Sequence, residues 1–118
     1  MAKFEFVEWL LLWLQETVQF EFEWDDGNRT KSETKHAVTT AETEEVFFLG
    51  LAAPLGTQVS PEVSEERLGI VGATSEGRVL HVVFTRRDGK VRPVSARPAH
   101  KKEREFYEAY LREISKGI

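Results

Sequence analysis

Three short apolar segments separated by two tight turns place the strongest limit on what this chain can fold into. The segments cover residues 67–73, 78–85 and 90–97. The first turn ends at Gly77, and the second contains Asp88-Gly89, a dipeptide typical of β-hairpins. Strands joined this closely pair antiparallel, so we expect a three-stranded meander.

Helical patterns flank this meander on both sides. We expect helices at about 27–36 and 40–49, and a final helix from about 98 to 115. Unbroken alternation of apolar and polar residues predicts a strand over 18–24. Residues 50–65 contain two glycines and two prolines, which favours a loop with one short strand at most. The expected fold class is α+β: one domain in which N-terminal helices and a C-terminal helix pack on a small antiparallel sheet.

The segment 4–16 predicts a helix that is apolar around most of its circumference. A small domain can cover only one side of a peripheral helix. We therefore expect Phe6, Trp9, Leu10 and Trp13 to contact a second copy of the chain or another protein. The alternative is that the helix lies under the sheet. The apolar run is too short to span a bilayer, and its flanking glutamates argue against binding to anionic lipid.

Positive charge is concentrated in one part of this acidic chain. Nine Lys or Arg residues and two acids lie between positions 78 and 104, whereas residues 1–66 hold 14 acids and four bases. The whole chain has a formal charge of −4. A basic block in an acidic protein suggests a polyanionic partner, with nucleic acid first. The lack of cysteine fits a cytosolic protein.

No motif for a metal, a cofactor or a nucleophilic enzyme occurs in the sequence, and the histidines lack carboxylates at ligand spacing. We therefore expect neither a metal nor a cofactor. A set of cations and a few ionisable groups suits RNA cleavage, in which the ribose 2′-hydroxyl attacks its own 3′-phosphate. A base and an acid move the protons, and fixed cations stabilise the charge on the phosphate.

Six short elements resemble BrnT toxins in order and spacing. They are Phe22-Glu23-Trp24-Asp25; Lys35-His36-Ala37-Val38 with Val46-Phe47; Glu66-Arg67; Thr85 with Arg87; Arg92 with Ser95-Ala96-Arg97 and Ala99; and Glu103-Arg104 with Tyr107. The resemblance implies a RelE-like core over 18–116, with the helix of residues 1–17 outside it. Asn28, Ala37 and Pro93 depart from the residues common in the family.

The resemblance implies a cytoplasmic ribonuclease toxin of a type II toxin–antitoxin system that cleaves RNA and blocks translation. A BrnA-like antitoxin, usually with a ribbon-helix-helix part, would be its partner and its only link to DNA. Two alternatives stay open: a non-catalytic or degenerate toxin that only binds nucleic acid, and an interaction module that uses the Trp9/Trp13 helix.

The candidate site residues come from the basic block and from the helix at 27–36. We expect catalytic roles for Arg67, Arg97, Lys31, Lys35 and His36, and RNA contacts from Arg87, Arg92, His100, Lys101 and Tyr107. For Arg97 the alternative is a surface ion pair, and for His36 it is a helix cap. Strand alternation puts Arg92 and Arg97 on opposite faces unless a bulge at Pro93 turns the strand.

Overall fold

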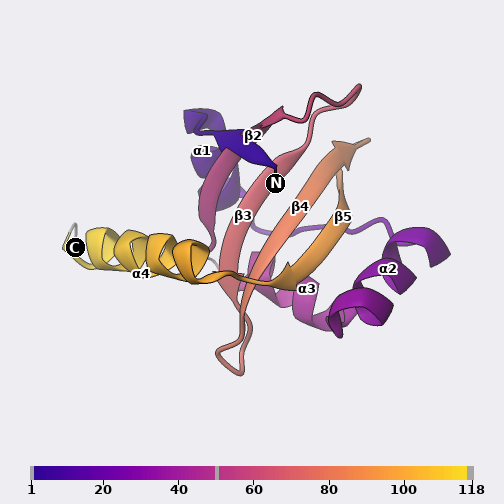
Figure 1. Ribbon diagram of the computed structural model, residues 1–118. Coiled ribbons are helices and arrows are strands. Elements are labelled where there is room, and N and C mark those ends of the chain that lie inside the picture. The colour runs from indigo at the N-terminus through magenta and orange to yellow at the C-terminus, as the bar shows by residue number, and fades with distance from the viewer. Residues whose placement is uncertain (1, 50, 117–118) are drawn as a thin grey trace.

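The computed structural model describes residues 2–49 and 51–116 as one α+β fold (Figure 1). In chain order its elements are β1 (Lys3–Glu5), α1 (Glu8–Glu16), α2 (Asp26–His36), α3 (Thr40–Phe48), β2 (Ala53–Ser60), β3 (Leu68–Ala73), β4 (Val79–Arg87), β5 (Lys90–Pro98) and α4 (Lys101–Lys116). The predicted α+β class and the helices α2, α3 and α4 are confirmed.

The strands form one antiparallel sheet in the order β1-β2-β3-β4-β5, so the predicted meander is its β3–β5 half. The register of β4 and β5 shifts where Phe84 pairs with Pro93 and Val83 pairs with Ser95. This confirms the irregularity predicted at Pro93. The extra residue brings Arg92 and Arg97 to the same face of the sheet, because they pair with positions 85 and 81 of β4.

Three N-terminal predictions are wrong in detail. Residues 50–65 were expected to form a loop with one short strand at most, but Ala53–Ser60 form the eight-residue strand β2, which pairs with both β1 and β3; residue 50 lies outside the described residues. The first helix begins at Glu8, and Lys3–Glu5 form a strand. Residues 18–24 form no strand beyond one bridge between Phe22 and Val91, because the edge of β5 is covered by α2.

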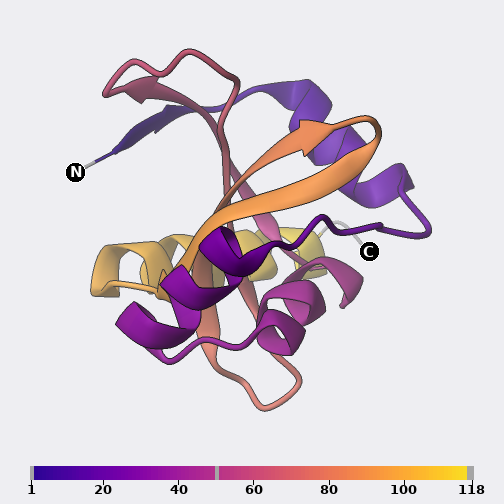
Figure 2. The same ribbon diagram turned by 90° about the vertical axis from the view of Figure 1, so that its right-hand side faces the viewer.

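The two faces of the sheet carry separate cores. On one face, Leu10 of α1 and Phe47 of α3 pack against sheet residues such as Phe84. On the other face, Tyr107 of α4 packs against Ala53 and Val71 with Ala99. Figure 2 shows α2 and α3 on the near side of the sheet and α4 passing behind it. The smaller core covers only part of its face, which leaves room beside β5.

Helix α2 is fastened to the edge of β5 by side-chain hydrogen bonds. Asp25 and Asn28 form a reciprocal capping box at the start of the helix. The Asn28 amide also donates to the carbonyls of Glu23 and Pro93, at 3.0 and 2.9 Å. One turn later, the Ser32 hydroxyl accepts a hydrogen bond from the backbone of Ala96. These contacts fix the first turns of α2 beside the bulge of β5.

A cation-lined cleft between α2 and the sheet

A cleft of about 280 Å³ lies where the start of α2 meets the bulge of β5. It is lined by Gly27, Asn28 and Lys31 from α2, by Glu65 and Arg67 before β3, by Arg87 at the end of β4, and by Arg92, Pro93 and Val94 of β5. Four of these nine residues are cationic and one is acidic. We call this hollow the cleft.

Arg67 is the cation in the cleft with unused hydrogen-bonding capacity. Its neighbour Leu68 is fully buried in the core beneath α1 and α3. Because side chains alternate along a strand, Arg67 points to the opposite face of the sheet, where the cleft lies. Its Nε atom is buried without a hydrogen-bond partner. Among the residues that the structure describes, its guanidinium forms no ion pair. A buried donor without a partner destabilises the fold, so an anion in the cleft would be stabilised by accepting a hydrogen bond from this N–H.

Arg87 and Arg92 are already held by carboxylates. Arg92 lies 3.0 Å from Glu23 and 2.6 Å from Asp25, and Arg87 lies 3.2 Å from Glu65. Hydrogen bonds from the Asn28 backbone and from Arg92 lower the pKa of Asp25, so this carboxylate stays charged. A phosphate would have to draw these two arginines from existing pairs.

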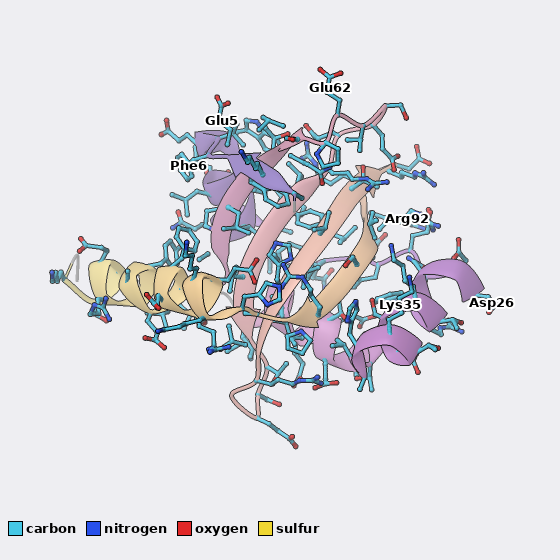
Figure 3. The ribbon with its side chains drawn as sticks, viewed as in Figure 1. Glu5, Phe6, Asp26, Lys35, Glu62 and Arg92 are labelled. Carbon is cyan, nitrogen blue, oxygen red and sulfur yellow. The ribbon has the colours of Figure 1, made fainter. Side chains whose placement is uncertain are left out.

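The two lysines of α2 lie on its solvent side. Lys31 lines the cleft and also a second, open hollow that contains Lys35, one turn further along the helix. Figure 3 shows Lys35 on α2 and Arg92 on β5 on the same side of the molecule. Lys31 therefore belongs to the cleft itself, whereas Lys35 lies beside it.

Arg97 belongs to a different cluster on the same face of the sheet. Both branches of its guanidinium bind Glu103 of α4 at 2.8 Å, and Glu103 also accepts the backbone N–H of His100. Burial raises the pKa of Glu103, but these hydrogen bonds outweigh it and lower the pKa to about 2. Arg97 thus fastens α4 to β5, as the ion-pair alternative anticipated.

His81 is buried beside this pair, with its Nε2 atom 3.7 Å from a Glu103 oxygen. Its Nδ1 atom is buried without a hydrogen-bond partner. Burial is the main reason that the pKa of His81 falls to about 4, which leaves the ring neutral at pH 7. The ring of Phe4 packs against it edge-on at 5.7 Å.

The other predicted site residues lie away from the cleft lining. His36 ends α2, and its carbonyl accepts a hydrogen bond from Arg78 at 3.3 Å. Tyr107 is buried in the smaller core, and this burial raises its pKa. His100 and Lys101 are exposed at the start of α4. The fold thus unites Lys31, Arg67, Arg87 and Arg92 and separates the remaining candidates from them.

Sequence reasoning missed two parts of the cleft. Glu65 lines it and neutralises Arg87, and the available signal was only its position two residues before Arg67. Asn28 was noted as a departure from the family, but its buried amide is a structural clamp. The spacing Asp25-x-x-Asn28 could have signalled the capping box.

The described residues contain neither a metal-binding cluster nor a membrane-spanning helix. No group of three His, Asp or Glu side chains is close enough there to hold a metal ion. Within the same ranges, no helix has the length and apolar character needed to cross a membrane.

Fold and cleft together define a small α+β protein with an arginine- and lysine-lined cleft at the edge of an antiparallel sheet. Comparison with protein families makes this specific: a family model described as "Ribonuclease toxin, BrnT, of type II toxin-antitoxin system" matches residues 24–103. The chain therefore belongs to the BrnT family of ribonuclease toxins, which implies an antitoxin partner. The match begins after β1 and α1, so both elements lie outside it.

A comparison with solved structures finds the Brucella abortus ribonuclease toxin BrnT. It shares 21% sequence identity, with a TM-score of 0.47, over 70% of this chain and 100% of that chain. A search of curated proteins finds no match.

Proposed function

We propose that this chain is a metal-independent endoribonuclease that inhibits translation by cleaving RNA in the cleft. The scissile phosphate would be held by Arg67 and Lys31. The observation that carries this proposal is the guanidinium of Arg67, which lines the cleft and forms no ion pair with another described residue, while its buried Nε atom has no hydrogen-bond partner among residues 2–49 and 51–116. Arginine suits the role because its planar fork binds two phosphate oxygens at once.

In the proposed reaction, the ribose 2′-oxygen forms a bond to phosphorus and the 5′-oxygen leaves. The products are a 2′,3′-cyclic phosphate end and a 5′-hydroxyl end. Negative charge grows on the phosphate oxygens during this step, and Arg67 and Lys31 would stabilise it. Glu65 is the carboxylate among the lining residues, so we assign it the role of accepting the 2′-hydroxyl proton, while a solvent water donates the proton that converts the leaving 5′-oxygen into a hydroxyl. Arg87 would then be released from Glu65 toward the phosphate.

We further propose that a BrnA-like antitoxin places an acidic segment in the cleft and so competes with RNA. Complementary charge would speed this association and fix its orientation. A ribbon-helix-helix part of that antitoxin would bind DNA, so the toxin would reach DNA only through its partner. The RNA substrate places this activity in the cytoplasm.

The test is incubation of purified, antitoxin-free protein with a structured RNA in the presence of EDTA. Wild-type protein should leave 2′,3′-cyclic phosphate ends. Arg67→Ala should lower the rate by about 10²–10³-fold, the loss typical of one preorganised donor to a transition-state anion. Arg112→Ala is the matched control, because Arg112 is exposed on α4, and it should cleave like wild type.

Two results would contradict the proposal. One is cleavage that EDTA abolishes and that added Mg²⁺ restores. The other is an Arg67→Ala variant that is folded and fully active.

A non-catalytic binder is the second candidate, and one observation favours it. Asn28, which stands where many BrnT proteins carry a lysine, is only 8% exposed and its amide is occupied by two carbonyls. The cleft therefore gains no cation from this position. In the same assay, a binder would show salt-sensitive RNA binding without any cyclic phosphate product.

A further inference from the structure

Helix α1 presents a second apolar face that points away from the core. Leu10 is fully buried, and Trp13 stacks on Phe84 with 5.7 Å between the ring centroids. The outward side carries Phe6, Trp9 and Leu12, which are 57%, 37% and 43% exposed. Of the four residues predicted to contact a partner, two are therefore used inside the fold, and Leu12 joins the exposed set.

This outward face is held in place by Arg86 of β4. The Arg86 guanidinium lies 4.5 Å from the centroid of the Trp9 ring and 5.4 Å from that of Trp13, and it pairs with Glu66 at 3.4 Å. Cation–π contacts of this kind stabilise the packing of the indole rings against the sheet. The helix is thus fixed to the sheet while one edge of Trp9 stays open to solvent.

Three carboxylates surround the apolar strip. Leu12 has Glu8 one helical turn before it and Glu16 one turn after it, and Glu5 precedes Phe6. All three glutamates are exposed, and none forms an ion pair with another described residue. The face is therefore apolar along its centre and carries three unpaired carboxylates at its rim, beside the Arg86–Glu66 pair.

A second copy of the chain is a poor occupant of such a face. A two-fold dimer brings the same patch of both subunits together, so the acidic rims would repel each other. An amphipathic helix with lysines or arginines beside its apolar stripe would bury the same side chains and also neutralise the rim. Charge complementarity thus selects a basic helix over self-association.

We propose that Phe6, Trp9 and Leu12, rimmed by Glu5, Glu8 and Glu16, form a docking surface for a basic amphipathic helix of another protein. Figure 3 shows Glu5 and Phe6 on the β1 side of the sheet and Lys35 and Arg92 on the β5 side. The docking surface shares no residue with the lining of the cleft. The inference goes beyond RNA cleavage and does not depend on whether the cleft is catalytic.

The experiment measures binding of fluorescently labelled synthetic helices to the full chain by anisotropy. One peptide has leucines on one face and lysines on the other, and its control has glutamates in place of the lysines. We expect tight binding of the basic peptide alone. Leu12→Ser and the double variant Glu8→Lys/Glu16→Lys should each weaken this binding by about tenfold or more. All proteins are compared at temperatures where thermal unfolding shows them folded.

Matched controls separate this surface from the general acidity of the chain. Phe106→Ser removes a 40%-exposed aromatic residue of α4, and Glu113→Lys reverses an exposed charge there; both should bind the peptide like wild type. Leu12→Ser should leave RNA affinity unchanged. Equal binding of both peptides, or equal losses in the α4 controls, would overturn the proposal. Concentration-dependent dimerisation that Leu12→Ser abolishes would do the same, by identifying a second copy as the occupant.

Discussion

Replacement of Glu103 by glutamine tests the assignment of Arg97 to a structural cluster. Glu103 binds Arg97 with both oxygens, caps the start of α4 through the His100 backbone, and lies 3.7 Å from His81. Its side chain is 18% exposed, so solvent screens these contacts only in part. Glu103→Gln keeps the shape of the side chain and removes its charge, which leaves Arg97 without a counter-ion.

The size of the effect follows from the pKa of Glu103. A pKa lowered from 4.5 to about 2 corresponds to about 3 kcal/mol of stability at neutral pH, where the folded and unfolded chains both carry the carboxylate. Unfolding entropy of roughly 2.1 cal/mol/K per residue gives about 0.25 kcal/mol/K for 118 residues. We therefore expect Glu103→Gln to lower Tm by about 12 °C at pH 7.

The pH dependence distinguishes this mechanism from a simple packing defect. Because the pKa of Glu103 is lowered in the folded state, its contribution is full above pH 4.5 and is lost as pH falls toward about 2. The pKa of His81 is also lowered, from 6.5 to about 4, so the unfolded chain binds this proton first and stability falls across that window too. Wild type and variant should converge near pH 2.

Thermal unfolding followed by circular dichroism at several pH values measures both effects. Glu113→Gln is the matched control, because that glutamate of α4 is exposed together with its partner Lys116, and its Tm should stay within about 1–2 °C of wild type. A Tm loss for Glu103→Gln that is small at pH 7, or equally large at pH 2 and pH 7, would refute the reasoning. In that case Arg97 would be available to bind an RNA phosphate.

Two further variants test how the cleft and the sheet edge are built. Asn28→Ala should cost about 3 kcal/mol, because it removes the capping box and leaves the carbonyls of Glu23 and Pro93 without the amide; urea unfolding measures this. Gly56→Ala should detach β1, since Gly56 has φ +126° and a Cβ there would collide with the Glu5 carbonyl. Faster amide exchange in β1 would show this, whereas Gly77→Ala, which meets open space at φ +83°, should cause only local strain.

The elements predicted from sequence are those fixed by local signals. The Asp-Gly turn sets the β4–β5 hairpin, and the Thr39–Glu42 capping box predicted for α3 is present in the structure. Strands β1 and β2 depend on each other across more than 50 residues, and Gly56 within β2 obscured the local pattern. The alternation at 18–24 correctly placed Phe20 and Phe22 against the core, where both are partly buried, but Val18 is 91% exposed and the edge of β5 is covered mainly by α2.

The site was harder to predict because charge alone does not show which cations are free. Arg67 and Arg97 were both predicted to be catalytic, because each lies in a family-like element at the end of a strand. Only the fold shows that Glu103 fills the fork of Arg97, while no described carboxylate does so for Arg67. The bulge at Pro93, predicted as a possibility, puts Arg92 and Arg97 on one face of the sheet, but only Arg97 is bound by α4, through Glu103.

In the folded protein, arginines of the basic block form ion pairs with carboxylates of the acidic N-terminal half. Four arginines of the basic block bind carboxylates of the acidic half: Arg78 binds Glu42, Arg86 binds Glu66, Arg87 binds Glu65 and Glu23, and Arg92 binds Asp25 and Glu23. The charged side chains that form no ion pair with another described residue therefore indicate possible binding partners better than the net charge does. Among the described residues, Arg67 and Lys31 in the cleft and Glu5, Glu8 and Glu16 around α1 form no ion pair. These two surfaces have opposite charge and share no residue, so they can serve two different partners, a phosphate backbone and a basic helix.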